Sequence, residues 1–197
     1  MRTHHAAPDR MGAFSDGVIA VVITIMVLEL RPPMNNSLTA LAPLWPTAIS
    51  YAVSYLFIAI IWMNHHHLLR FVRQATPALL WLNFAHLFAV SLLPFATNWM
   101  ADSRLSATPV AAYASLFVVV NLIYLAFERE VLRHADERRF PAAAQRTARR
   151  RSIITVSTFA VAALATMAPW LGFALICTAL LLYVSPEAPS RMLTLIK

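Results

Sequence analysis

The feature that most constrains this chain is a charged, polar cluster set directly against a long apolar run. The cluster spans residues 10–16 and leads without a break into a stretch that carries no further charge until Glu29. A membrane span contains an acid such as Asp16 only where the acid has partners or a function. We therefore expect residues 12–30 to form a membrane-crossing helix, with Asp16 belonging to its anchorage.

The composition extends this expectation to the whole chain. Of the 197 residues, 59% are hydrophobic and 13% are charged, whereas soluble domains carry about 25% charged residues. An integral, all-α membrane protein folded as a single domain is expected. Six apolar runs are long enough to be candidate spans: residues 12–30, 44–67, 77–100, 109–127, 152–167 and 170–184.

The basic residues predict the orientation of these spans. If the N-terminus is cytoplasmic, 14 of the 16 lysines and arginines lie on the cytoplasmic side, and only Arg31 and Arg104 lie outside. Short loops with such an excess of positive charge stay in the cytoplasm. We therefore expect both termini in the cytoplasm.

The longest loop, residues 128–151, contains eight arginines. We interpret it as a helix end that continues past the membrane and contacts anionic lipid heads. No aromatic platform or binding motif accompanies this charge, so a nucleic-acid partner is not expected. The two outer loops are too short to form a binding domain.

The first span has two distinct faces. At 100° per residue, one group of side chains falls within about 60° of a single line on the helix. On the opposite side lie Ile19, Ile23, Met26 and Leu30, and Asp16 points to that side too. The first group is Phe14, Gly17, Val18, Val21, Thr24, Ile25 and Leu28. The same periodicity also fits a helix packed on all sides, with Thr24 hydrogen-bonded to its own backbone.

Three consecutive histidines, His65, His66 and His67, end the second span. Consecutive helical residues splay 100° apart, so the three cannot face one ion, and no further ligand stands at i+4. A metal site is therefore not expected. Trp62 and His66 share a face at i and i+4.

Polar residues from three spans fall at matching depth. In the expected topology Ser15 and Asp16 lie near the cytoplasmic face, residues 64–67 reach that face, and Asn83 lies one to two turns above it. We infer a buried hydrogen-bonded network of Ser15 and Asp16 with histidine or asparagine from the neighbouring spans. A structural network and a proton relay both fit these groups, because histidine titrates near neutrality.

No catalytic pattern is present. The chain has three glycines, no Gly-rich phosphate loop, no HExxH and no paired nucleophile and base. We expect neither an enzyme nor a bound cofactor.

At these residues the chain resembles the transmembrane protein 175 family, the endosomal and lysosomal potassium channels with prokaryotic members. The matching stretches are Arg10-x3-Phe14-Ser15-Asp16, the run from Gly17 to Leu30, Trp62-x2-His65-His66, and the third-span run from Leu80 to Phe95. The resemblance covers residues 10–100.

The resemblance implies a potassium-permeable channel that lacks the TVGYG filter, and no TVGYG occurs here. Prokaryotic members are single six-span units assembled as homotetramers, in which the first helix of each subunit lines a central pore. The family's apolar constriction falls on Val21, with further pore layers at Ile25 and Leu28 and a threonine layer at Thr24. Potassium is then the permeant ion, and the protein lies in a bacterial inner membrane among its lipids.

The resemblance also divides the first helix by role. Arg10, Phe14, Ser15 and Asp16 become the cytoplasmic clasp that docks it to its neighbours, together with Trp62, His65, His66 and Asn83. Val21 stands where isoleucine or leucine is commoner in the family, and a smaller side chain widens a constriction that gates by dewetting.

Two other functions remain open on the sequence. One is a proton-permeable or proton-coupled transporter that uses Asp16 and the second-span histidines. The other is a structural or regulatory membrane protein without transport.

Overall fold

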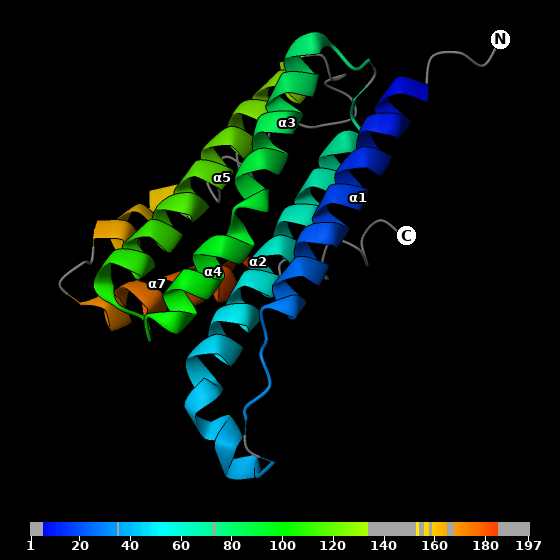
Figure 1. Cartoon of the computed structure of the whole chain (residues 1–197). Helices are drawn as coiled ribbons and strands as arrows, with labels where there is room; N and C mark the ends of the chain where they lie inside the picture. The colour runs from blue at the N-terminus through cyan, green and yellow to red at the C-terminus, as the bar shows by residue number, and fades with distance from the viewer. Residues whose placement is uncertain are drawn as a thin grey trace, which may run out of the picture.

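The protein is a bundle in which the longest helices run side by side and the C-terminal helix crosses them at an angle (Figure 1). The computed structural model describes residues 6–34, 36–72, 74–133, 153, 156–157, 159–164 and 168–184, and in these residues all regular structure is helical. The elements are α1 (Ala6–Leu28), the 3-10 helix η1 (Leu38–Leu44), α2 (Trp45–Leu69), α3 (Pro77–Ser91), α4 (Leu93–Asp102), α5 (Ala107–Arg133) and α7 (Pro169–Val184).

Four of the described stretches are long and apolar enough to cross a membrane, which makes this a multi-pass membrane protein. They are Pro8–Leu28, Leu38–Leu69, Pro77–Asp102 and Ala107–Arg133. Of the last two expected spans, α7 corresponds to 170–184 and is shorter, while the expected 152–167 span lies partly outside the described residues, with 159–164 helical. The eight-arginine loop also lies outside them beyond Arg133, the residue at which α5 ends.

The third span is two helices rather than the single one expected from the sequence. α3 ends at Ser91 and α4 begins at Leu93, with Pro94 in the first turn of α4. Proline has no backbone N–H, so the helical bond that residue 94 would make is missing and the helix breaks just before it. At the start of α3, Thr76 is an N-cap whose Oγ1 accepts from the Leu79 N–H at 3.2 Å.

The core lies between α2, α3, α4, α5 and α7, and α1 packs against α2, α3 and α4 with Ile19, Val22 and Met26 in the same cluster. The largest hydrophobic cluster includes Phe57 and Phe117, whose rings stack with centroids 3.6 Å apart. A smaller cluster around Leu79 and Phe127 closes the end of the bundle near the N-terminus. Packing of α1 against only one side of the bundle leaves its other side uncovered.

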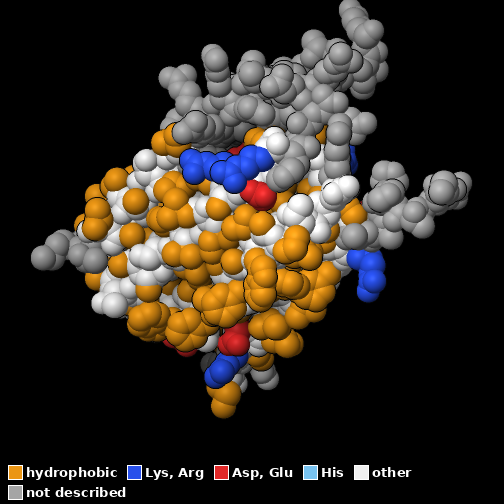
Figure 2. Space-filling view, turned by 90° about the horizontal axis from the view of Figure 1, so that it is seen from above, with side chains coloured by type: hydrophobic (Ala, Val, Ile, Leu, Met, Phe, Trp, Pro, Cys, Tyr) orange, Lys and Arg blue, Asp and Glu red, His pale blue; other side chains and the backbone are white. Residues whose placement is uncertain are grey.

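The surface agrees with a membrane environment. Hydrophobic side chains cover much of the face that Figure 2 shows, and charged side chains gather at a few points. At the end of the bundle opposite the N-terminus, the segment between α1 and α2 projects past the other helices (Figure 1).

Candidate functional site

The uncovered side of α1 carries the side chains that the sequence placed on one helical face. Val21 is 55% exposed, Ile25 43% and Leu28 79%, and Thr24 is exposed beside them. On the other side, Met11, Ser15, Ile19, Val22 and Met26 are buried against the bundle. α1 therefore presents an apolar stripe with one hydroxyl away from the rest of the described bundle. It is called here the outward stripe (Val21, Thr24, Ile25 and Leu28).

One expected residue of the inward face lies elsewhere. The helix wheel puts Leu30 on the side opposite the stripe of a helix extending to residue 30, but α1 ends at Leu28 and Leu30 is exposed. The last turn closes with 3-10-type bonds from the Glu29 and Leu30 N–H groups to the Met26 and Val27 carbonyls.

The Thr24 hydroxyl has a defined direction. Its Oγ1 donates to the Val21 carbonyl oxygen at 2.8 Å, which occupies the hydroxyl hydrogen and leaves the oxygen lone pairs directed outward. The backbone bond expected for a helix packed on all sides is thus present, but the described residues do not cover this face. An oxygen with free lone pairs can replace one water of a cation's hydration shell.

Behind the stripe, three helices are joined by one directed chain of buried hydrogen bonds. Asn83 of α3 donates through Nδ2 to Ser15 Oγ at 3.0 Å, and Ser15 Oγ donates to the Met11 carbonyl at 2.9 Å. Asn83 Oδ1 can only accept, so the 2.7 Å contact with His65 Nε2 of α2 fixes that nitrogen as the donor. All three polar side chains are at least 99% buried.

Asp16 lies outside this buried chain, contrary to the expected pairing with histidine or asparagine. Its Oδ1 accepts from Trp62 Nε1 at 2.8 Å in an exposed position. The indole of Trp62 also stacks on His66, with ring centroids 5.4 Å apart, and Arg70 Nη2 lies 3.4 Å from His66 Nε2. A helix wheel gives the direction of Asp16 but not which neighbouring side chain reaches it first.

Two further motif residues face outward. Arg10 is exposed, and Phe14, also exposed, meets Phe84 of α3 edge to face with ring centroids 5.7 Å apart. An open cleft lies at the same end between α1 and the end of α2, with Asp9, Asp16 and Arg70 among its lining residues.

A second buried hydrogen-bond chain was missed by the sequence analysis. Tyr113 of α5, Ser54 of α2 and Thr97 of α4 are joined by oxygen–oxygen contacts of 2.5 and 2.7 Å. Thr97 Oγ1 donates to the Leu93 carbonyl at 2.7 Å, so Ser54 donates to Thr97 and Tyr113 donates to Ser54. Isolated hydroxyls in apolar runs carry no charge, and only their shared depth in three spans could have indicated the cluster.

The two buried chains are separated by an apolar layer. On α2, Ser54 and His65 are eleven positions apart, about 16 Å along the helix, and Phe57, Ile58, Ile60 and Ile61 between them are buried. His86 of α3 stacks on His65 with centroids 5.8 Å apart and is fully buried. In the described part of the chain no three His, Cys, Asp or Glu residues form a group that could hold a metal ion.

Comparison with known proteins places this arrangement in a family. Residues 10–94 match the family described as endosomal/lysosomal potassium channel TMEM175. A protein named as a potassium channel from Chryseobacterium sp. (strain P1-3) is 40% identical over 128 residues, which cover 65% of this chain and 67% of that protein. The chain belongs to the TMEM175 family. Since its relatives are ion channels, the expectation that the protein is not an enzyme is confirmed.

Two other TMEM175 proteins bear on fold and function. A human protein named as an endosomal/lysosomal proton channel is 31% identical over 130 residues, which cover 60% of this chain and 25% of that protein. The crystal structure of a lysosomal potassium-selective channel TMEM175 homologue from Chamaesiphon minutus aligns with a TM-score of 0.77 and 23% identity, covering 91% of this chain and 97% of that chain. The helical bundle is therefore the TMEM175 fold.

Proposed function

We propose that this TMEM175 protein is a potassium-permeable channel for monovalent cations, assembled as a homotetramer in which α1 of each subunit lines a central pore. The observation that carries the proposal is the outward stripe, which runs along a membrane-spanning helix and has no partner among the described residues of its own subunit. The potassium channel names of the bacterial relatives support the choice of ion.

The one-sided exposure of α1 is the reason for an oligomer. A single helix offers one stripe and cannot enclose a pathway, whereas copies related by a rotation axis place the same stripe on every side. Four copies form a closed ring with α2 to α7 outside it, in contact with lipid. The stripe then forms successive rings of Val21, Thr24, Ile25 and Leu28.

The apolar rings and the threonine ring have different roles in conduction. Branched apolar side chains at Val21, Ile25 and Leu28 constrict the pore and control its wetting. The Thr24 hydroxyl oxygens supply four polar ligands between the apolar rings, since each hydroxyl hydrogen is held by the Val21 carbonyl. The pore carries no charged ring on this stripe, so cation selectivity rests on oxygen ligands and pore width.

The buried chain Ser15–Asn83–His65 has a structural role in this proposal. It fixes the rotation of α1 against α2 and α3, and this rotation decides which residues reach the pore. Asp16 and Trp62 hold the same helix at its exposed cytoplasmic edge. We place the protein in a bacterial inner membrane with both termini in the cytoplasm, because the basic residues lie on that side.

A proton-permeable protein is the second candidate, favoured by the proton channel name of the human relative. The route through Asp16 and the histidines would run inside the subunit. Along α2 that route meets the buried apolar layer between His65 and Ser54, which offers no proton carrier among those side chains. Water entering the central pore would be the alternative path.

Ion flux into proteoliposomes tests the proposal. Val21→Trp is expected to abolish potassium flux because four indoles fill the constriction, while light scattering still reports a tetramer. Val119→Trp is the matched control, since Val119 of α5 is similarly exposed but lies far from α1 in the chain. Unchanged flux in Val21→Trp, or a monomeric wild-type protein, would refute the pore. A current whose reversal follows the pH gradient rather than the potassium gradient would favour the proton candidate.

A further inference from the structure

The segment between α1 and α2 carries apolar surface that its own subunit leaves uncovered. η1 buries none of its seven residues. Residues three apart in a 3-10 helix lie in one row, so Leu38, Leu41 and Leu44 form a ridge, called here the leucine ridge. Leu38 is 87% exposed, and Met34, shortly before the ridge, is fully exposed.

The leucine ridge belongs to the apolar stretch Leu38–Leu69, but α2 is long enough to cross the membrane without it. α2 alone has 25 residues, and about 20 suffice to cross the hydrocarbon core. Trp45 at the start of α2 stacks on Trp170 at the start of α7, with ring centroids 5.5 Å apart, and such tryptophans gather at the membrane surface. η1 continues outward from Trp45 for about 14 Å, at about 2 Å per residue.

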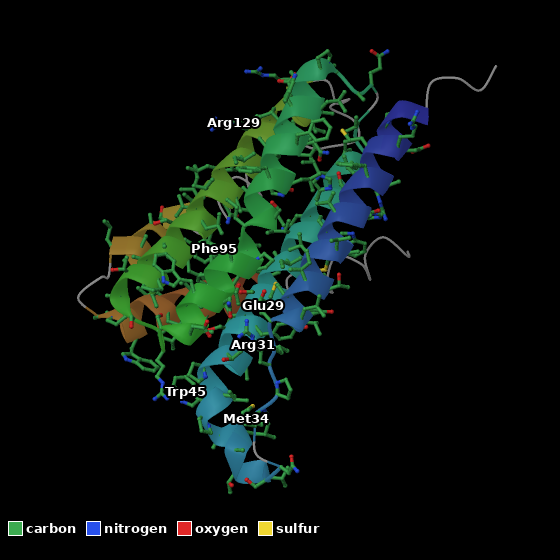
Figure 3. The ribbon with its side chains drawn as sticks, viewed as in Figure 1. Glu29, Arg31, Met34, Trp45, Phe95 and Arg129 are labelled. Carbon is green, nitrogen blue, oxygen red and sulfur yellow. The ribbon has the colours of Figure 1, made fainter. Side chains whose placement is uncertain are left out.

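The figures agree with this placement. Figure 1 shows the segment projecting from the bundle, and Figure 3 shows Met34 and Trp45 at this end with Arg129 near the other. If the hydrocarbon core ends near Trp45 and Trp170, lipid tails would not reach the ridge, and water would surround it in an isolated subunit.

The form of η1 also points to stabilisation from outside the subunit. 3-10 helices longer than three or four residues are uncommon because their hydrogen bonds are poorly aligned. η1 has seven residues, and Pro43 within it has no N–H to donate. Its own hydrogen bonds and burial therefore give η1 little stability, which packing of its leucines against another surface would increase.

We propose that the leucine ridge and Met34 pack against the same segment of neighbouring subunits, forming an apolar collar around the outer mouth of the pore. The proposal rests on the tetramer proposed above. α1 ends at Leu28 and η1 begins at Leu38, so nine residues tether the ridge to the helix at the pore axis. The exposed surface of α1 continues through Leu30 to Met34.

A second copy explains the position of this surface. Around a rotation axis the leucine ridges of adjacent subunits meet each other beside Met34, and the contacts close into a ring. Each subunit thereby removes its leucines from water without needing any other molecule.

Thiol labelling of the intact protein tests the collar. Cys177 is the only cysteine, so Leu38→Cys and Thr39→Cys are made in a Cys177→Ala parent. Thr39 is the matched control because it is exposed on η1 but off the ridge. In proteoliposomes a membrane-impermeant maleimide should label Leu38→Cys severalfold more slowly than Thr39→Cys, and the two should react equally in SDS. Mild oxidation should give covalent dimers of Leu38→Cys.

Three outcomes would overturn the collar. The first is equal labelling of both cysteines in a protein that is tetrameric and conducts potassium, which leaves the proposed function intact. The second is slow labelling of Leu38→Cys without covalent dimers, because lipid or another protein then covers the ridge. The third is a monomeric Cys177→Ala parent together with a monomeric wild-type protein, which refutes the tetramer itself.

Discussion

The two faces of α1 are both largely apolar, yet they differ in what they touch. The inward face is buried and contains one serine, which is tied through Asn83 to His65. The outward stripe is exposed and contains one threonine, which is tied only to its own helix. Hydropathy alone does not separate the two faces, because a membrane helix is apolar toward lipid and toward protein alike.

The contacts of the two faces distinguish the residues that fix the position of α1 from those that can contact an ion. A polar group that bonds to another helix fixes the rotation of α1, since turning the helix would leave that group unpaired in an apolar interior. A polar group that bonds to its own backbone fixes nothing outside the helix and remains available to an ion. Substitutions on the inward face should therefore change stability, and those on the stripe should change permeation.

The largest stability effect is expected from Asn83→Leu. This change removes the acceptor of His65 Nε2 and the donor to Ser15 Oγ in a buried site, while Ser15 keeps its bond to the Met11 carbonyl. We expect a loss of about 1–3 kcal/mol. The measurement is denaturant unfolding in detergent micelles, with potassium flux normalised to the folded protein. Flux per folded channel should stay close to that of the wild type.

Asn121→Leu is the control for this prediction. Asn121 donates to the Phe117 carbonyl of its own helix at 2.8 Å, so its loss should have a much smaller effect on stability. Equal destabilisation by the two substitutions would show that the chain between helices has no special role.

A smaller effect is expected at the second buried chain from Tyr113→Phe. The ring stays in place, but Ser54 loses the hydroxyl that donates to it, and we expect about 1–2 kcal/mol of destabilisation. Tyr55→Phe is the control, because Tyr55 is on the exposed surface of α2. If Tyr113→Phe unfolds at the same denaturant concentration as Tyr55→Phe, the hydrogen-bond chain of Tyr113, Ser54 and Thr97 does not stabilise the bundle.

The helical fold and the two faces of α1 could be predicted from the sequence because both depend on period and hydropathy. A 100° wheel separates Ile19 and Met26 from Val21 and Ile25, and the structure buries the first pair and exposes the second. The juxtaposition of Ser15, Asn83 and a histidine followed from their matching depth in three spans.

What the sequence did not reveal depends on contacts between side chains. The wheel could not show that Trp62, four residues before His66, reaches Asp16 before any histidine does. Ser54, Thr97 and Tyr113 carry no charge, so hydropathy did not mark them. The break before Pro94 follows from the missing N–H of proline, but hydropathy alone predicted one continuous span.

The smallest loss of stability is expected from Trp62→Phe. This variant tests whether the exposed hydrogen bond to Asp16 contributes less to the position of α1 than the buried chain does. The variant keeps an aromatic ring against His66 but removes the N–H that donates to Asp16 Oδ1. Because water can replace this donor at an exposed site, we expect a loss of only about 0.5 kcal/mol. Unfolding in detergent beside Asn83→Leu measures the difference. If Trp62→Phe lowered stability as much as Asn83→Leu, the exposed Asp16–Trp62 hydrogen bond rather than the buried chain would set the position of α1. The direction in which the outward stripe faces would then depend on Asp16.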